Sequence, residues 1–154
     1  MQTQRRSVLK KLFTSLVGVT GLGLIANAKA NSNDEKEVNG IVYDQDVPLF
    51  SQITKLGNLV FIAGQGAHFQ GDIKSHTDHV LKSMEEQLVK AGSSMEKVLK
   101  VSVFLNDIND YAGMNEVFKG RFGNNPPVRT TVAVAAGGVP GNSLVEMDCM
   151  CYRW

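Results

Sequence analysis

One arginine interrupts an otherwise small and apolar segment, residues 128–135. Side chains alternate between the two faces of a strand, so Arg129 and Thr131 are expected on one face and the valines of this segment on the other. Burying a guanidinium is unfavourable unless it meets an anion or another polar partner. Arg129 is therefore the first residue that we expect to bind an anionic group.

The last apolar segment, residues 144–152, has the same asymmetry. Its odd-numbered positions are apolar and predict a core face, whereas Glu146 and Asp148 share the opposite face. Placed in one sheet, the two strands would bring Arg129 and both carboxylates to a common face. Spacing alone leaves two interpretations open: an anion-binding site on the sheet, or a structural ion pair between Arg129 and Glu146.

The remaining periodicity predicts the elements that must position these residues. Helical spacing or strand-like alternation is found in residues 41–43, 52–56, 59–63, 73–91, 98–105, 109–122, 128–135 and 144–152, of which 73–91 and 109–122 are the helices. Gly57-Asn58 is typical of a two-residue hairpin turn. This order favours an α+β fold with a single mixed β-sheet and two helices on one face. The other face is too apolar to be fully exposed to solvent. This favours a homo-oligomer with the charged residues in clefts between subunits.

The first thirty residues are typical of an export signal rather than of a folded domain. Residues 4–10 follow the twin-arginine pattern, and residues 12–26 are apolar but short for a helix that spans a membrane. Residues 28–30 predict cleavage before residue 31. We therefore expect a protein of the bacterial periplasm with no membrane partner after cleavage. An uncleaved N-terminal membrane anchor is the alternative.

The predicted boundaries follow from this signal: residues 1–30 form the signal peptide, 31–46 a flexible leader and an edge strand, and 47–154 the folded domain. The signal contains five basic residues and no acidic one. Of 16 basic and 15 acidic residues in the chain, the mature protein keeps 11 and 15, a net charge of −4. A nucleic-acid partner is not expected, because binding one requires a basic surface.

Neither the cysteines nor the histidines predict a metal site, and no cofactor is expected. Cys149 and Cys151 both fall on the predicted core face and are interpreted as buried thiols. His76 and His79 are three residues apart on the first helix, a spacing that can bind a metal. Without a third ligand they are interpreted as solvated helix residues. His68 lies in the loop after the second hairpin strand, where it would border a pocket.

Several short motifs, in the same order along the chain, resemble the reactive-intermediate deaminase family, also called RidA or YjgF. The resemblance extends over about residues 47–150, nearly the whole predicted domain. The motifs that carry it are Ser51-Gln52, Gly57-Asn58-Leu59-Val60-Phe61-Ile62-Ala63-Gly64-Gln65, Ala91-Gly92-Ser93-Ser94, Val101-Ser102-Val103-Phe104-Leu105-Asn106-Asp107, Asn115-Glu116-Val117-Phe118, Pro127-Val128-Arg129-Thr130 and Leu144-Val145-Glu146-Met147.

The resemblance implies a chorismate-mutase-like fold and a homotrimer with sites at the subunit interfaces. It also implies hydrolysis of reactive enamines and imines to 2-keto acids and ammonia without a cofactor. By position, it implies that Arg129 binds the substrate carboxylate and that Glu146 orients water. Gly64 corresponds to a glycine whose backbone lines the pocket, and Asn115 to an asparagine that often approaches it.

Two positions of the implied site depart from the family pattern. Phe50 stands where a tyrosine is common and Thr131 where a cysteine is common, and both are kept as substrate-binding candidates. These departures also suit a non-catalytic trimer that binds a small carboxylate, which is the main alternative function. Ribonuclease activity, ascribed to some relatives, is disfavoured by the acidic charge of the mature chain. A chaperone role independent of Arg129 is the remaining alternative.

Overall fold

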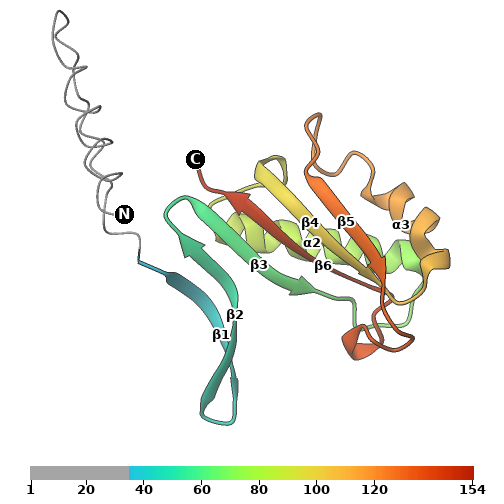
Figure 1. Cartoon of the computed structure of the whole chain (residues 1–154), viewed down its shortest axis with the longest axis horizontal. Coiled ribbons are helices and arrows are strands. Elements are labelled where there is room, and N and C mark those ends of the chain that lie inside the picture. The colour runs from blue at the N-terminus through green and yellow to red at the C-terminus, as the bar shows by residue number, and fades with distance from the viewer. Residues whose placement is uncertain (1–34) are drawn as a thin grey trace, which may run out of the picture. The chain divides into compact units, whose positions relative to one another are not determined.

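The computed structural model describes residues 35–154, which contain one six-stranded mixed sheet. The order across the sheet is β1-β2-β3-β6-β4-β5, and only β4 and β5 run parallel (Figure 1). The strands are β1 (Glu37–Asp44), β2 (Val47–Leu56), β3 (Leu59–Gln65), β4 (Val98–Leu105), β5 (Val128–Ala133) and β6 (Val145–Tyr152). The predicted signal peptide, residues 1–30, lies outside the described residues.

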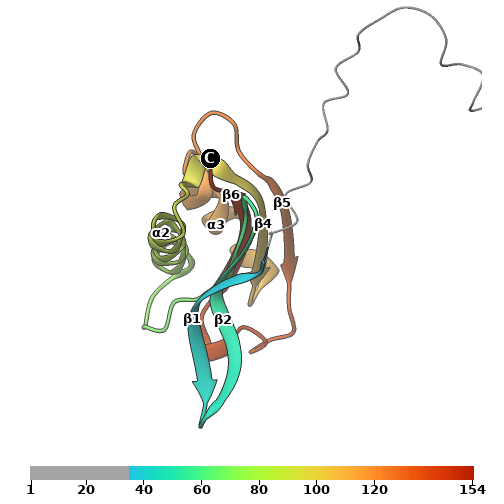
Figure 2. The same cartoon turned by 90° about the vertical axis from the view of Figure 1, so that its left-hand side faces the viewer.

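Two helices, α2 (Ile73–Lys90) and α3 (Tyr111–Phe118), pack on the same face of this sheet. Figure 2 shows the sheet nearly edge-on, with both helices on one side of it and the other side open. Three short 3₁₀ turns connect the elements: η1 (Met95–Lys97), η2 (Ile108–Asp110) and η3 (Pro140–Asn142). The predicted α+β fold class, with one mixed sheet and two helices on one face, is confirmed.

Helix α2 supplies most of the helical side of the core. Its buried residues recur at helical spacing and face β3 and β6. The carboxylate of Asp72 accepts a hydrogen bond from the backbone N–H of Ser75, which satisfies one of the free donors at the start of the helix. Gly92, with φ of +81°, follows the last turn. The predicted helix, 73–91, is thus confirmed to within one residue.

The register of the three strands β4, β5 and β6 decides which side chains share a face. Val101 of β4 lies opposite Cys149 of β6 and opposite Arg129 of β5, and this row faces the helices. Phe104 lies opposite Glu146 and opposite Val132, and this row faces away from them. The expectation that Arg129 and Glu146 share a face was therefore wrong.

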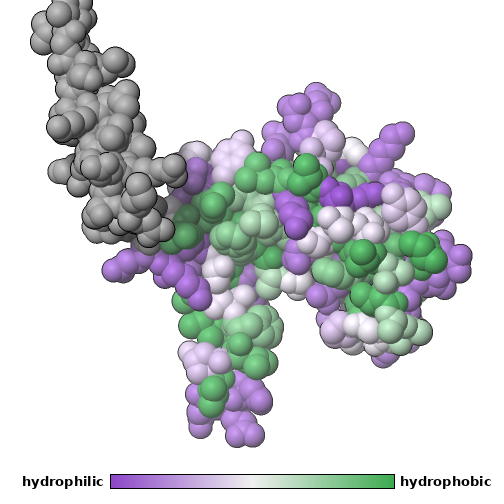
Figure 3. Space-filling view, in the orientation of Figure 1, coloured by the Kyte–Doolittle hydropathy of each residue, from purple (hydrophilic) through white to green (hydrophobic). Residues whose placement is uncertain are grey.

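The error has a physical cause in the position of β5 at the edge of the sheet. The helical side of β5 is covered only in part, so a half-buried arginine fits there against α3. The valines of β5 lie on the open face instead, where Val128 keeps 69% of its surface exposed. Figure 3, in the orientation of Figure 1, shows apolar side chains gathered on this open face. Alternation could not tell the two faces apart because both of them are partly apolar.

Strands β1 and β2 form a hairpin that projects from the rest of the sheet (Figures 1 and 2). Only residues 53–56 of β2 pair with β3, so the rest of the hairpin extends beyond it. The sequence predicted a flexible leader through residue 37 and only a short strand at 41–43. In the structure β1 begins at Glu37, whose carboxylate accepts two hydrogen bonds from Arg153 near the C-terminus.

Two smaller predictions also need correction. A register shift between Val98 and Lys100 leaves Leu99 exposed, although alternation in the predicted strand 98–105 groups it with Val101, Val103 and Leu105, which are buried. Helix α3 ends at Phe118 rather than at residue 122, and Phe122 is buried in the turn that follows. Within residues 35–154, no helix is both long enough and apolar enough to cross a membrane.

Candidate functional site

The guanidinium of Arg129 lies in a cradle of side chains from a single helix, α3. Nη2 donates a hydrogen bond to the hydroxyl of Tyr111 at 3.2 Å, and Nη1 lies 4.0 Å from the sulfur of Met114. The guanidinium carbon is 4.7 Å from the ring centre of Phe118 and 5.7 Å from that of Tyr111, both within the range of cation–π attraction. We call Tyr111, Met114 and Phe118 the Arg129 cradle.

In the part of the chain that the structure describes, no carboxylate forms an ion pair with this guanidinium. Among residues 35–154, the ion pairs involve Lys74, Lys82, Arg121 and Arg153, but not Arg129. The structural ion pair between Arg129 and Glu146 is therefore not formed within the chain. A half-buried, always protonated side chain with unused N–H donors is suited to bind an anion, above all a carboxylate that can accept two parallel hydrogen bonds.

Two further candidates lie on the same side of the sheet as Arg129. Thr131 is two residues along β5, and its hydroxyl is buried without a hydrogen-bond partner in the described chain. Asn115 follows Met114 on α3 and is half-buried. The structure thus places Arg129 and Thr131 on the helical side of β5, the side on which α3 with Asn115 lies.

Glu146 lies in a different region, on the open face of the sheet. It borders a pocket of about 210 Å³ whose other lining residues are Phe104, Val134, Gly138, Val139 and Pro140. We call this the Glu146 pocket. Gly64 of β3 lies directly against the carboxylate: a Cβ atom at this glycine would overlap Oε1 and lie 2.8 Å from Cδ. The glycine is therefore needed for the close approach of β3 to the Glu146 side chain.

Buried hydrogen bonds fix the backbone beside the Glu146 pocket. The hydroxyl of Ser143 accepts from the N–H of Ala67 at 2.9 Å and donates to the carbonyl of Val145 at 2.6 Å. The ring of His76 accepts from the N–H of Leu144 through Nδ1, at 3.1 Å, so that Nε2 donates to the carbonyl of Phe69 at 2.9 Å. These bonds tie β6 to the loop after β3.

The prediction that His76 and His79 are both solvated was therefore wrong for one of them. His76 is 1% exposed, because its two ring nitrogens serve backbone groups of two different segments, whereas His79 is exposed. His68 lies at the border of the same region, with Nδ1 at 3.3 Å from the carbonyl of Gly141. Residues 35–154 contain no group of three potential metal-ligating side chains.

Phe50 belongs to neither region. It lies on the projecting hairpin, paired with Val42, and half of its surface is exposed. The six predicted site residues thus fall into three groups within one chain: Arg129 with Thr131 and Asn115, Glu146 with Gly64, and Phe50 alone.

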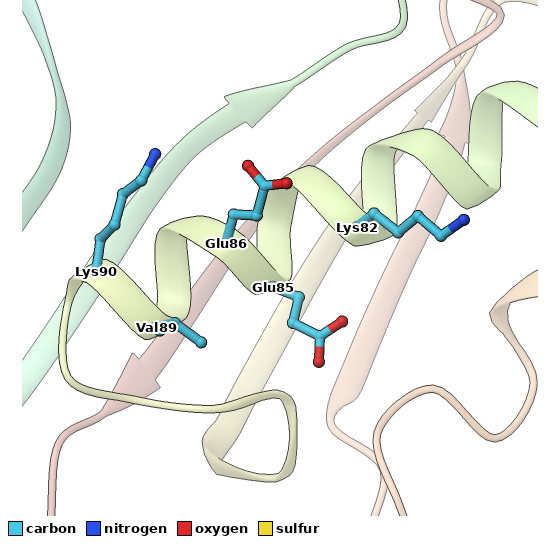
Figure 4. Close-up of a pocket in the computed structure, with 5 residues that line it drawn as sticks. All are labelled: Lys82, Glu85, Glu86, Val89 and Lys90. Atoms are coloured by element: carbon cyan, nitrogen blue, oxygen red, sulfur yellow. The ribbon is translucent and has the colours of Figure 1, made fainter.

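One hollow of the described surface contains none of these residues. It has a volume of about 590 Å³ and lies along α2, bordered by Lys82, Glu85, Glu86, Val89 and Lys90. Figure 4 shows these side chains extending from the exposed side of the helix. Flexible, charged and solvated side chains do not provide the convergent polar groups of a ligand site. A second hollow, of about 320 Å³, lies between η1 and the turn after α3 and includes no predicted site residue either.

The two cysteines lie on the core side of β6, behind Glu146. Burial raises the pKa of the Cys149 thiol far above its ordinary value, and burial also raises the pKa of Cys151. Both are free thiols and buried. Their predicted structural role is confirmed, because a protonated, inaccessible thiol is not a nucleophile.

Sequence reasoning missed the partners of the two charged residues. Tyr111 and Phe118 fall within the predicted helix 109–122, and their spacing of seven residues gave no sign that they flank a guanidinium. The residues that line the Glu146 pocket from 138 to 140 fall between the predicted segments 128–135 and 144–152, where no element or site was predicted. A signal for His76 did exist: a histidine among the apolar positions of α2 suggests a buried ring with two partners.

Comparisons with known proteins agree with the fold and with the motifs. The family model described as endoribonuclease L-PSP matches residues 45–152. A RutC family protein of Pyrococcus abyssi is 40% identical over 111 residues, which cover 68% of this chain and 86% of the relative. The chloroplastic Reactive Intermediate Deaminase A of Arabidopsis thaliana is 32% identical over 108 residues, covering 66% of this chain and 57% of that protein.

A solved structure extends the likeness to three dimensions. The crystal structure of E. coli TdcF with bound serine aligns with a TM-score of 0.65 at 27% identity, covering 75% of this chain and 100% of the other. The match of the family model over most of residues 35–154, the identity to the RutC protein and the shared fold lead to one conclusion. The chain belongs to the endoribonuclease L-PSP family, which includes the RutC, YjgF and RidA proteins.

Proposed function

We propose that this protein hydrolyses small enamines or imines that carry a carboxylate, releasing the 2-keto acid and ammonia. The observation that carries the proposal is the half-buried guanidinium of Arg129, which no carboxylate neutralises in the described chain. The deaminase name of the plant relative and the serine bound to TdcF support a small amino- or imino-carboxylate as the substrate class.

The reaction requires little of the protein. The guanidinium of Arg129 holds the substrate carboxylate through two parallel N–H bonds, and a charge-assisted bond contributes about 1.5–3 kcal/mol. The Glu146 carboxylate orients a water toward the imine carbon and accepts one of its protons. An enamine first tautomerises to the imine. The water oxygen then bonds to the imine carbon, Glu146 returns the proton to the nitrogen, and the C–N bond breaks as the carbonyl forms and ammonia leaves. Gly64 keeps the space that Glu146 occupies.

We propose that a homotrimer assembles the complete site. Arg129 and Glu146 lie on opposite sides of the sheet within one chain, so association is the simplest way to bring them to one substrate. The apolar open face and the projecting hairpin with Phe50 are surfaces for such association (Figure 3). Each substrate would then contact Arg129 of one subunit and Glu146 of the next.

Subunit mixing tests this arrangement directly. The purified protein is supplied with 2-imino acids generated by an amino-acid oxidase, and the decay of the imine is followed with and without protein. We expect Arg129→Ala to raise KM at least tenfold and Glu146→Gln to lower kcat about 100-fold. Unfolding and refolding the two variants together should restore part of the activity, because some interfaces then pair two intact residues. No recovery in verified mixed oligomers contradicts the shared site.

A non-catalytic carboxylate-binding protein is the second candidate. It is favoured by the same separation, since Arg129 and its cradle form a binding group that does not require Glu146. In that case the wild type would bind 2-keto acids in an Arg129-dependent manner, and would not accelerate imine decay for small, branched or aromatic side chains.

The site of action is proposed from the N-terminal residues alone. The twin-arginine pattern in residues 4–10 supports export to the periplasm, with cleavage after residue 30. Fractionation of cells that produce the chain tests this: the wild type should appear in the periplasm, shortened by about thirty residues. The double change Arg5→Lys and Arg6→Lys should leave it in the cytoplasm. Equal export of the wild type and the double variant would contradict the proposal.

A further inference from the structure

The charged end of Arg129 is held by side chains that carry no negative charge. Tyr111, Met114 and Phe118 are spaced by three, four and seven residues on α3, so they lie on one side of the helix. One of them provides a hydroxyl, one a sulfur and two an aromatic ring within 6 Å of the guanidinium carbon. The whole cradle therefore belongs to one element, α3.

We infer that Tyr111 is a positioning residue for the carboxylate-binding arginine. This inference rests on the proposed function, because it concerns the same carboxylate. The hydroxyl of Tyr111 accepts a hydrogen bond from Nη2, and this bond fixes the rotation of the planar guanidinium about its long, flexible stem. Phe118 restricts the same plane from a ring centre 4.7 Å away.

The chemistry of the cradle explains why it can position Arg129 without blocking it. An aspartate or glutamate at this place would neutralise the guanidinium and compete with a bound carboxylate. A phenol hydroxyl accepts a hydrogen bond from one of the five N–H donors and leaves the charge of the guanidinium intact. The aromatic faces attract the cation but accept no strong hydrogen bond. Apart from the long contact of Nη1 with the Met114 sulfur, the other donors of Arg129 stay available for a carboxylate.

Because Tyr111 acts on the guanidinium only, its removal should affect the binding of the carboxylate and not the attack on the imine carbon. Tyr111→Phe keeps the ring and removes the hydroxyl. We expect the Kd for 2-oxobutanoate and the KM for the matching imino acid to rise about fivefold to tenfold, with kcat within about twofold of the wild type. Phe118→Leu should raise the same two constants by a smaller factor.

The experiment measures binding by calorimetry for wild type, Tyr111→Phe, Phe118→Leu and Arg129→Ala. The ligands are 2-oxobutanoate and its uncharged amide, which lacks the carboxylate. If Tyr111 has a merely structural role, Tyr111→Phe should weaken the binding of both ligands alike. If Tyr111 positions Arg129, the variant should weaken the binding of the carboxylate only. Tyr152→Phe is the matched control, because Tyr152 lies on β6 outside the cradle, and it should bind as the wild type does. Circular dichroism and gel filtration confirm that each variant keeps its fold and assembly.

The outcomes separate this inference from the proposed function. If Arg129→Ala loses carboxylate binding while Tyr111→Phe binds and turns over as the wild type does, the inference is overturned and the proposed function stands. Equal weakening of the acid and the amide by Tyr111→Phe also overturns it. If Arg129→Ala binds as tightly as the wild type, or if the wild type neither binds nor hydrolyses the carboxylates, the proposed function fails and the inference fails with it.

Discussion

The Arg129 cradle and the Glu146 pocket lie on opposite sides of the same sheet and are stabilised by different kinds of interaction. At the Glu146 pocket, buried hydrogen bonds from Ser143 and His76 hold backbone groups. Around the cradle, Arg129 contacts two aromatic rings, and the nearby links from α2 to α3 and to the turn after α3 are ion pairs. One joins Asp78 to Arg121 at 2.8 Å, and another joins Lys74 to Glu116.

The difference indicates what each region must do. Buried hydrogen bonds to backbone are costly to break, because each lost bond leaves a polar group without water. They suit a carboxylate that must stay at a fixed place beside the β3 backbone. Surface ion pairs contribute little each. The cradle holds the plane of the Arg129 guanidinium without neutralising its charge, which suits a cationic side chain that binds an incoming anion.

The largest expected effect concerns His76, the buried histidine of α2 whose ring accepts a hydrogen bond from the backbone N–H of Leu144, just before β6. His76→Ala leaves the N–H of Leu144 and the carbonyl of Phe69 without partners and opens a cavity, so we expect unfolding to require about 3 kcal/mol less free energy. Arg129→Ala should lower the free energy of unfolding by about 1 kcal/mol or less. Urea unfolding at a fixed protein concentration measures both. His76→Gln is the matched control, because an amide offers one donor and one acceptor. If both His76→Ala and Arg129→Ala lowered the free energy of unfolding by similar amounts, the two regions would not differ in how they are stabilised.

A second change separates the two regions by their kinetics. Gly64→Ala places a methyl group where the Glu146 carboxylate lies, and the flexible side chain must turn away. We expect kcat to fall about 10- to 100-fold, or about 1.4–2.7 kcal/mol, with KM nearly unchanged because Arg129 is on the other side of the sheet. Steady-state kinetics measure this split. Gly120→Ala, at a glycine with no neighbour within 4 Å, tests for a general effect of such substitutions, after allowance for its φ of +80°. A rise in KM alone for Gly64→Ala would contradict the assignment.

The smallest effect concerns the surface tie beside the cradle. Hydrogen bonds from Lys82, and next from Arg121, hold the pKa of Asp78 below its ordinary value. A depressed carboxyl pKa adds stability above the unfolded value of about 3.9, and this stability is lost as the pH falls through the folded value. Because the side chain is 38% exposed, we expect Asp78→Asn to cost less than about 1 kcal/mol at pH 7.

Unfolding of this variant and the wild type at pH 7 and pH 3 tests the expectation. The difference between the two proteins should shrink at pH 3. A difference at pH 7 comparable to that of His76→Ala would mean that surface ion pairs, too, fix the structure around Arg129.

The helices and most strands were predictable because their periodicity has one explanation. Helix α2 has a single apolar stripe, so its range follows from spacing. Strand β1 was largely missed because its residues remain exposed and pair only with β2. Arg129 and Glu146 were found as charged residues in otherwise apolar strands, and the other candidates were found through family motifs, which give residue types at fixed positions. Their grouping could not be found in this way, because motifs say nothing about the face on which a side chain lies.

The sequence by itself determined the fold class, the family and the presence of an arginine suited to bind an anion. These follow from the order of periodic segments and from residue types, both of which are local properties of the chain. Only the tertiary structure decided that Arg129 faces the helices and Glu146 the open side. The side on which a β5 residue lies is set by the parallel register with β4, a contact between segments about 30 residues apart in the chain. Where both sides of an edge strand are partly apolar, alternation leaves that choice undetermined.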